Sequence, residues 1–125
     1  MYRAPFLRGK PMPFTAQSRG DIVVVKVHAR RLNAHVAPEF KTRLVYLVQS
    51  GHERIVVDMT ALECIDSSGL GALIAGLKAL GGRGEIVLCG ITPRLLSLFT
   101  LTHVAKLFHI FDSIEEAVGG LVTSA

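Results

Sequence analysis

The residues best suited to chemistry stand together near the middle of the chain, where Asp66, Ser67 and Ser68 are followed by Gly69. At the start of a helix, such side chains act as caps because their oxygens accept hydrogen bonds from the free N–H groups of the first turn. A serine placed there can also carry a phosphoryl group, since a helix start favours negative charge. That group would present a charge of up to about −2 to a docked partner. The spacing leaves both roles open.

Three patterns of catalysis fit the sequence poorly. A serine hydrolase typically has GxSxG around its nucleophile, whereas Ile65 and Asp66 precede the two serines here. Residues 81–84 (GGRG) lack the lysine and the hydroxyl of a phosphate-binding loop and are typical of a helix end. Glu115 and Glu116 fall on an expected helix surface, where carboxylates are solvated. We therefore expect that the chain is not an enzyme.

The cysteines and histidines indicate neither a metal site nor a cofactor. The five histidines show no HxxxH or HExxH spacing. Cys64 and Cys89 form no CxxC motif, and we expect both to be reduced thiols in the core. No metal ligand and no cofactor is predicted.

Length and composition fit one compact domain. The chain has 125 residues, of which 50% are hydrophobic and 19% charged, so there is enough apolar material for a core. Residues 1–13 are rich in proline and basic side chains, and we expect a flexible basic lead-in there, followed by one domain over residues 14–125. No apolar run approaches the roughly 18 residues of a membrane span, and no secretory signal is evident, so a cytoplasmic protein is expected.

The net charge of +4 is concentrated at one end of the chain. Residues 1–31 hold seven basic side chains against Asp21 alone, whereas the rest holds seven basic and nine acidic side chains. No basic recognition helix and no aromatic-rich basic strand accompanies this excess. Nucleic-acid binding is therefore not expected.

The elements that must hold residues 66–69 in place follow from the hydrophobic pattern. Residues 22–28 form a β-branched run, and residues 14–17 provide a hairpin partner across the turn at residues 18–21. The run has few polar interruptions, which indicates a strand buried on both faces. Further strands are expected at residues 55–57, 85–89 and 107–111.

Helices are expected between these strands because apolar residues recur at intervals of three and four. Two such sets are Phe40, Leu44, Leu47 and Val48, and Leu70, Leu73, Ile74 and Leu77. Thr92 before Pro93 starts a third helix, and residues 112–115 fit a capping box for a fourth. Strands that alternate with helices predict an α/β domain with a small mixed sheet.

Two stretches carry a resemblance to a known family. The first is IVVDMTALECIDSSGLGALI at residues 55–74, and the second is ITPRLLSLFTLTHVAKLFHIFDSIEEAV at residues 91–118. Together they resemble the STAS domain, in particular the stand-alone anti-sigma factor antagonists of bacteria, over about residues 14–122. The resemblance implies a small mixed sheet with helices packed on one side.

The resemblance also implies a function by partner switching. In that family the unphosphorylated antagonist binds a serine kinase that is an anti-sigma factor, which then releases its sigma factor. The kinase phosphorylates the serine after the signature aspartate, a position that matches Ser67, and a PP2C-type phosphatase removes the mark. We expect the partner to bind the start of this helix and the neighbouring turn, which comprise Asn33, Asp66, Ser67, Ser68 and Gly69. An arginine at Gly69 should then block the partner without unfolding the domain.

One stretch departs from the family pattern. The family usually has G-x-L-D before the first helix, whereas residues 30–33 read RRLN. Asn33 keeps the turn geometry of an aspartate but loses its charge. An alternative function is that of a STAS module serving as a structural subunit of a lipid-transport or signalling assembly, in which Ser67 is only a cap.

Overall fold

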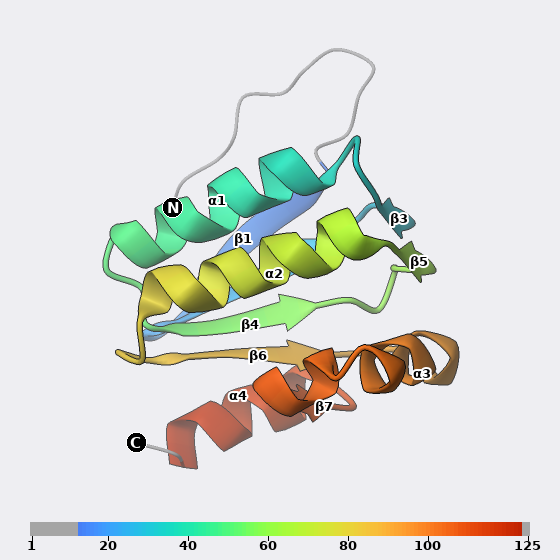
Figure 1. Ribbon diagram of the computed structural model, residues 1–125. Helices are drawn as coiled ribbons and strands as arrows, with labels where there is room; N and C mark the ends of the chain where they lie inside the picture. Colours follow the sequence, from blue (N-terminus) through green and yellow to red (C-terminus); the bar gives the residue numbers. More distant parts are fainter. Residues whose placement is uncertain (1–12, 124–125) are drawn as a thin grey trace.

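The computed structural model describes residues 13–123, with side chains through Leu121 (Figure 1). The expected lead-in over residues 1–13 lies, apart from Pro13, outside the described residues. The elements in chain order are β1 (Phe14–Arg19), β2 (Ile22–Val27), β3 (Arg31–Leu32), α1 (Ala37–Gln49), β4 (Arg54–Asp58), β5 (Cys64–Ile65), α2 (Ser67–Leu80), β6 (Glu85–Cys89), α3 (Pro93–Leu101), the 3-10 helix η1 (Val104–Leu107), β7 (His109–Phe111) and α4 (Ile114–Thr123).

Five strands form the main sheet in the order β1-β2-β4-β6-β7. β1 runs antiparallel to β2, and the other neighbouring strands are parallel, so the predicted mixed sheet is confirmed. The central strands β2, β4 and β6 are apolar almost throughout, as expected of strands covered on both faces.

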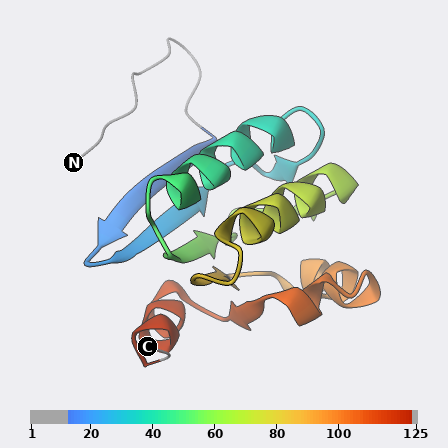
Figure 2. The ribbon, with the colours of Figure 1, turned by 60° about the vertical axis from the view of Figure 1, so that its left-hand side comes forward.

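Helices cover both faces of this sheet. α1 and α2 lie side by side on one face, above a core that includes Val25, Val57 and Leu88 (Figures 1 and 2). α4 packs on the opposite face, where its buried residues meet the other side of the central strands; this second cluster contains Ile22, Val24, Val56, Val87, Cys89, Ala117 and Leu121. The expectation of helices packed on one side is therefore wrong for α4. Strands that are apolar on both faces need cover on both.

The C-terminal elements begin at or close to the predicted residues. Thr92 caps α3 as predicted, since its Oγ1 accepts a hydrogen bond from Leu95 N at 3.4 Å. The cap of α4 is Ser113 rather than Asp112, because Ser113 Oγ accepts a hydrogen bond from Glu116 N at 3.1 Å. The last strand begins two residues later than expected because Leu107 belongs to η1.

Two short strands outside the main sheet were not predicted. β3 and β5 pair in parallel, with Arg31 opposite Cys64 and Leu32 opposite Ile65, and we call this pair the β3–β5 ladder. Leu32 and Ile65 are buried, whereas Arg31 and Cys64 are exposed. A two-residue strand is too short to show an alternating pattern. The ladder joins the turn before α1 to the start of α2 (Figure 1).

Candidate functional site

Asp66 caps α2. Its backbone is extended, with φ −114° and ψ −172°, and its Oδ1 accepts a hydrogen bond from Gly69 N at 3.1 Å. Its carbonyl oxygen accepts the bond from Leu70 N at 3.0 Å. This arrangement leaves the N–H groups of Ser67 and Ser68 without an acceptor in the helix.

Ser67 and Ser68 are the first two residues of α2, and both are exposed. Neither hydroxyl bonds to another residue in the described part of the chain. Successive helix residues are turned by about 100° around the axis, so the two hydroxyls project in different directions. Both oxygens are accessible to a second protein.

Gly69, which the sequence places in the expected partner-binding surface, is buried. A Cβ at this position would lie 2.5 Å from Leu32 O and 2.6 Å from Ile65 Cγ1. The backbone oxygen of Leu32 belongs to the β3–β5 ladder, so it cannot move aside without disturbing the pairing of these strands. An arginine at position 69 would therefore disturb the fold, and the expectation that it acts on the partner alone is wrong.

Asn33 forms the turn before α1. Its Oδ1 accepts a hydrogen bond from His35 N at 3.0 Å, and its carbonyl oxygen accepts from Ala37 N at 2.7 Å. The predicted turn is thus present. Asp66 N donates to Leu32 O at 3.3 Å, so Asn33 and Asp66 follow paired residues and leave the ladder at the same end. We call Asn33, Asp66, Ser67, Ser68 and Gly69 the α2-start site.

An ion pair at the edge of this site was missed by the sequence analysis. Arg30 Nε lies 2.9 Å from Glu63 Oε2, and Arg30 Nη2 donates to Glu63 Oε1 at 3.1 Å. These hydrogen bonds raise the pKa of Arg30 and lower the pKa of Glu63. Both side chains are exposed. The two residues are 33 positions apart, and no local pattern connects them.

A buried carboxylate organises the connection from β4 to β5. Asp58 is 2% exposed, and its Oδ1 accepts hydrogen bonds from Thr60 N at 3.0 Å and from Thr60 Oγ1 at 2.6 Å. A Cβ at Gly90 would collide with Thr60 Oγ1, so Gly90 allows this connection to pack closely. Asp58 therefore positions the chain that leads to the α2-start site.

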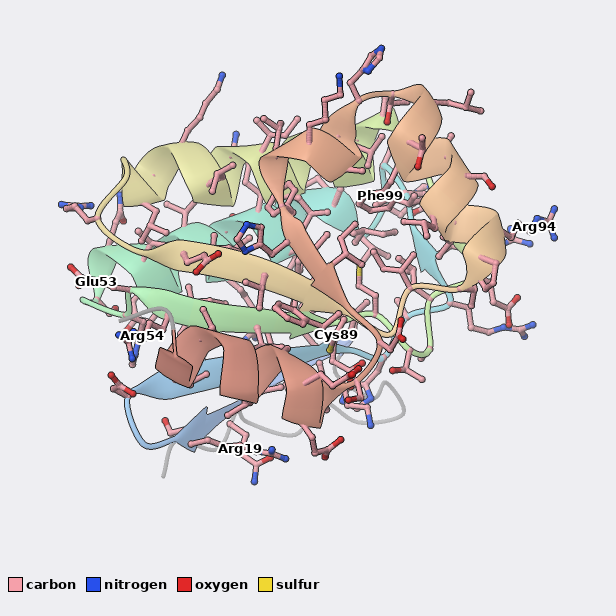
Figure 3. The ribbon with its side chains drawn as sticks, turned by 90° about the horizontal axis from the view of Figure 1, so that it is seen from below. Arg19, Glu53, Arg54, Cys89, Arg94 and Phe99 are labelled. Atoms are coloured by element: carbon pink, nitrogen blue, oxygen red, sulfur yellow. The ribbon has the colours of Figure 1, made fainter. Side chains whose placement is uncertain are left out.

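The two cysteines differ in their surroundings. Both are free thiols, and Cys89 is buried as predicted, whereas Cys64 is exposed. The expectation that Cys64 lies in the core is wrong because its side chain faces outward from the β3–β5 ladder. Burial, together with the nearby Asp58 and Glu115, raises the pKa of Cys89 to about 12. Figure 3 shows Cys89 at the end of β6, close to α4.

Other features of the described chain lie apart from this site. Within residues 13–123, no group of three or more His, Cys, Asp or Glu side chains is placed to hold a metal ion. None of the helices in that range combines the length and the apolar character needed to cross a membrane. An open groove of about 910 Å³ lies between β1 and α1, with Phe14, Ala16, Tyr46 and Leu47 in its lining. None of the residues lining the groove belongs to the α2-start site.

Several bacterial proteins are similar to this chain in sequence, and two of them are described here. The anti-sigma-B factor antagonist of Listeria monocytogenes is 36% identical over 94 residues, which cover 74% of this chain and 81% of that protein. The anti-sigma-B factor antagonist of Staphylococcus epidermidis is 30% identical over 96 residues, which cover 76% of this chain and 88% of that protein.

Solved structures share the fold at lower sequence identity. The Bacillus cell fate determinant SpoIIAA in its phosphorylated form has a TM-score of 0.67 at 19% identity, covering 85% of this chain and 96% of that chain. A sulfate transporter family protein from Wolinella succinogenes has a TM-score of 0.72 at 19% identity, and the match covers 82% of this chain and 86% of that chain. The family model of the STAS domain matches residues 13–117. On this match and the sequence relatives, the chain belongs to the STAS domain family.

Proposed function

We propose that the protein is an anti-sigma factor antagonist that acts by partner switching. In its unphosphorylated form it binds a serine kinase that is an anti-sigma factor, phosphorylation of Ser67 releases it, and a PP2C-type phosphatase restores the binding form. The observation that carries the proposal is the exposed, unbonded hydroxyl of Ser67 directly after the Asp66 cap. The names of the relatives from Listeria and Staphylococcus support the antagonist role.

The hydrogen bonds at the start of α2 favour a phosphate on Ser67. Asp66 occupies the N–H group of Gly69, and the N–H groups of Ser67 and Ser68 remain available in the first turn. A phosphate attached at Ser67 lies near these donors and near the positive end of the helix dipole. The modified serine is therefore compatible with an intact helix.

The proposed release acts at the surface rather than through the core. The side chains that hold α2 on the sheet, such as Leu70 and Leu73, are buried beneath the exposed serines. A phosphate adds bulk and a charge of up to about −2 to the covered surface. Binding of the kinase is then lost through clash and repulsion while the domain stays folded.

Three variants test this function with the cognate kinase, radiolabelled ATP and phosphopeptide mapping. We expect Ser67→Ala to abolish labelling and keep kinase binding, and Ser67→Asp to weaken binding without unfolding. Ser68→Ala should still be labelled on Ser67. Ser97→Ala is the matched control, since Ser97 is an exposed serine on α3.

Two results would contradict the proposal in different ways. Label on Ser68, or undiminished labelling of Ser67→Ala, would show that Ser67 is not the acceptor. Equal partner binding by Ser67→Ala and Ser67→Asp would favour the alternative, a structural subunit of a lipid-transport or signalling assembly in which the serine is not a switch.

A further inference from the structure

The strand β1 has a free backbone edge. It is the outermost strand in the order β1-β2-β4-β6-β7, so within residues 13–123 only one of its edges is paired (Figure 2). Natural proteins usually protect such an edge with a proline, a charged side chain or a bulge. Residues 14–18 (FTAQS) contain no proline and no charge, and their register with β2 is uninterrupted. This edge is therefore open to a further strand.

The register of β1 with β2 shows which backbone groups face the free edge. His28 N donates to Pro13 O at 2.7 Å, so residues 13 and 28 are a hydrogen-bonded pair. Opposite residues of antiparallel strands alternate between hydrogen-bonded and non-hydrogen-bonded pairs. Phe14, Ala16 and Ser18 therefore fall in non-hydrogen-bonded pairs, and their N–H and C=O groups point away from β2. In the described part of the chain, these groups bond to no other segment.

A second copy of the same edge is complementary to it. In an antiparallel arrangement with Ala16 opposite Ala16 of the second copy, Phe14 lies opposite Ser18 of that copy. The outward N–H groups of each strand then meet the outward C=O groups of the other. At the remaining positions, Thr15 lies opposite Gln17, so no like charges oppose each other over residues 14–18. The edge can thus pair with itself about a twofold axis at Ala16.

The groove between β1 and α1 lies along this edge. Ala16 and Ser18 line the groove from β1, and Tyr46 and Leu47 line it from α1. Tyr46 is 68% exposed, so a large aromatic surface is left in water. Pairing of two β1 edges brings the grooves of the two copies together. Burial of Tyr46 there adds apolar stabilisation to the backbone hydrogen bonds.

We propose that the protein forms a homodimer in which β1 pairs antiparallel with β1 of a second copy, centred on Ala16. The main sheets of the two copies then form one continuous sheet. This inference goes beyond the proposed function and does not depend on it. No residue of the α2-start site belongs to β1 or lines the groove, so both copies keep that site open to a partner.

Charged side chains at the twofold axis test the pairing and its register. Ala16 is exposed, and Ala16→Lys or Ala16→Glu places two like charges directly opposite each other only if the strands pair at this residue. Ala16→Gln is the matched control, since it adds a long side chain without a charge. The mass of each full-length variant is measured by sedimentation velocity between about 1 μM and about 500 μM, because dimer formation depends on concentration. Circular dichroism confirms that each variant is folded.

Rescue by mixing is the expected signature. The parent chain and Ala16→Gln should form dimers as the concentration rises, and each charged variant should dimerise about fivefold more weakly. An equimolar mixture of Ala16→Lys and Ala16→Glu should regain dimer formation, because opposite charges then face each other at the axis.

Amide hydrogen exchange of the parent chain provides a second measurement. The outward amides of Ala16 and Ser18 should exchange more slowly as the concentration rises, because they become bonded to the second copy. The amide of Gln17, which faces β2, should keep the same rate.

Three results would overturn the dimer. The first is a parent chain that stays monomeric at the highest concentration. The second is a mixture of Ala16→Lys and Ala16→Glu that dimerises no better than either variant alone. The third is protection of the Ala16 amide in the monomer, which would show that another segment of the same chain covers the edge.

Discussion

Gly69 is the residue at which the main chain of α2 comes close to β3. The position that a Cβ would take is filled by the backbone oxygen of Leu32 and the side chain of Ile65. Two residues later, Gly71 is exposed, and a Cβ there would meet nothing within 4 Å. The two glycines of the same helix therefore have different physical roles.

Alanine at these two positions should change stability in opposite directions. Gly69→Ala should lower the free energy of unfolding by about 1–3 kcal/mol, because a backbone oxygen blocks the added methyl group. Gly71→Ala should raise it by about 0.5–1 kcal/mol, because alanine is the better helix former. Urea unfolding followed by circular dichroism measures both. Equal stability of Gly69→Ala and the parent would mean that α2 does not begin in close contact with β3.

The position of the α2-start site also depends on hydrogen bonds made by residues outside it. The Asp58 carboxylate holds Thr60, and the Arg30 backbone oxygen holds Glu63 and Cys64. These contacts define the path of the chain from β4 to Asp66. These contacts, together with the Asp66 cap, determine where Ser67 lies.

At the scale of elements, α4 covers the face of the sheet opposite α1 and α2. Its buried residues Ala117 and Leu121 are 0% and 1% exposed and pack on β2, β4 and β6. These three strands are apolar on both faces, so a domain without α4 would expose Ile22, Val24, Val56, Val87 and Cys89 to water.

Leu121→Ala tests this role of α4. It should lower the free energy of unfolding by about 2–5 kcal/mol, because it removes buried methyl groups from the second face. Leu101→Ala is the control: Leu101 is 78% exposed, and its loss should change stability by less than about 0.5 kcal/mol. A thermal midpoint of Leu121→Ala within a degree or two of the parent would show that α4 does not cover the sheet.

At the scale of the whole molecule, the stable part and the site lie in different places. The central strands are paired on both sides and covered on both faces. The site instead lies on a ladder of two residues per strand at one end of the fold (Figure 1). The proposed binding and release of a partner at this ladder would therefore leave the core largely unchanged.

Amide hydrogen exchange should follow this division. Amides of β4 and β6, such as those of Val56 and Val87, should exchange most slowly, because they open only with global unfolding. Amides of β3 and β5 should exchange faster, because few buried contacts hold the short ladder. The rates are normalised to those of the unfolded chain and measured by NMR. Protection of the ladder equal to that of β4 would contradict this view.

Features that depend on neighbours along the chain were predictable from the sequence. The β-branched run of β2, the Thr92 cap before Pro93, and the apolar face of α2 are local patterns, and all three are present. The α/β class follows from their alternation. The start of α2 at residues 66–67 was likewise predictable, since Asp66 and the serines are favoured in the first turn.

The tertiary structure alone decided which distant residues meet. The pairing of Leu32 with Ile65, the ion pair of Arg30 with Glu63 and the burial of Gly69 all join segments about 30 residues apart. The apolar stripe of α4 predicted a helix but not the face of the sheet that it covers. Local sequence patterns reflect only the preferences of neighbouring residues. These contacts form because burial of the apolar core brings elements that are distant in the sequence within bonding distance.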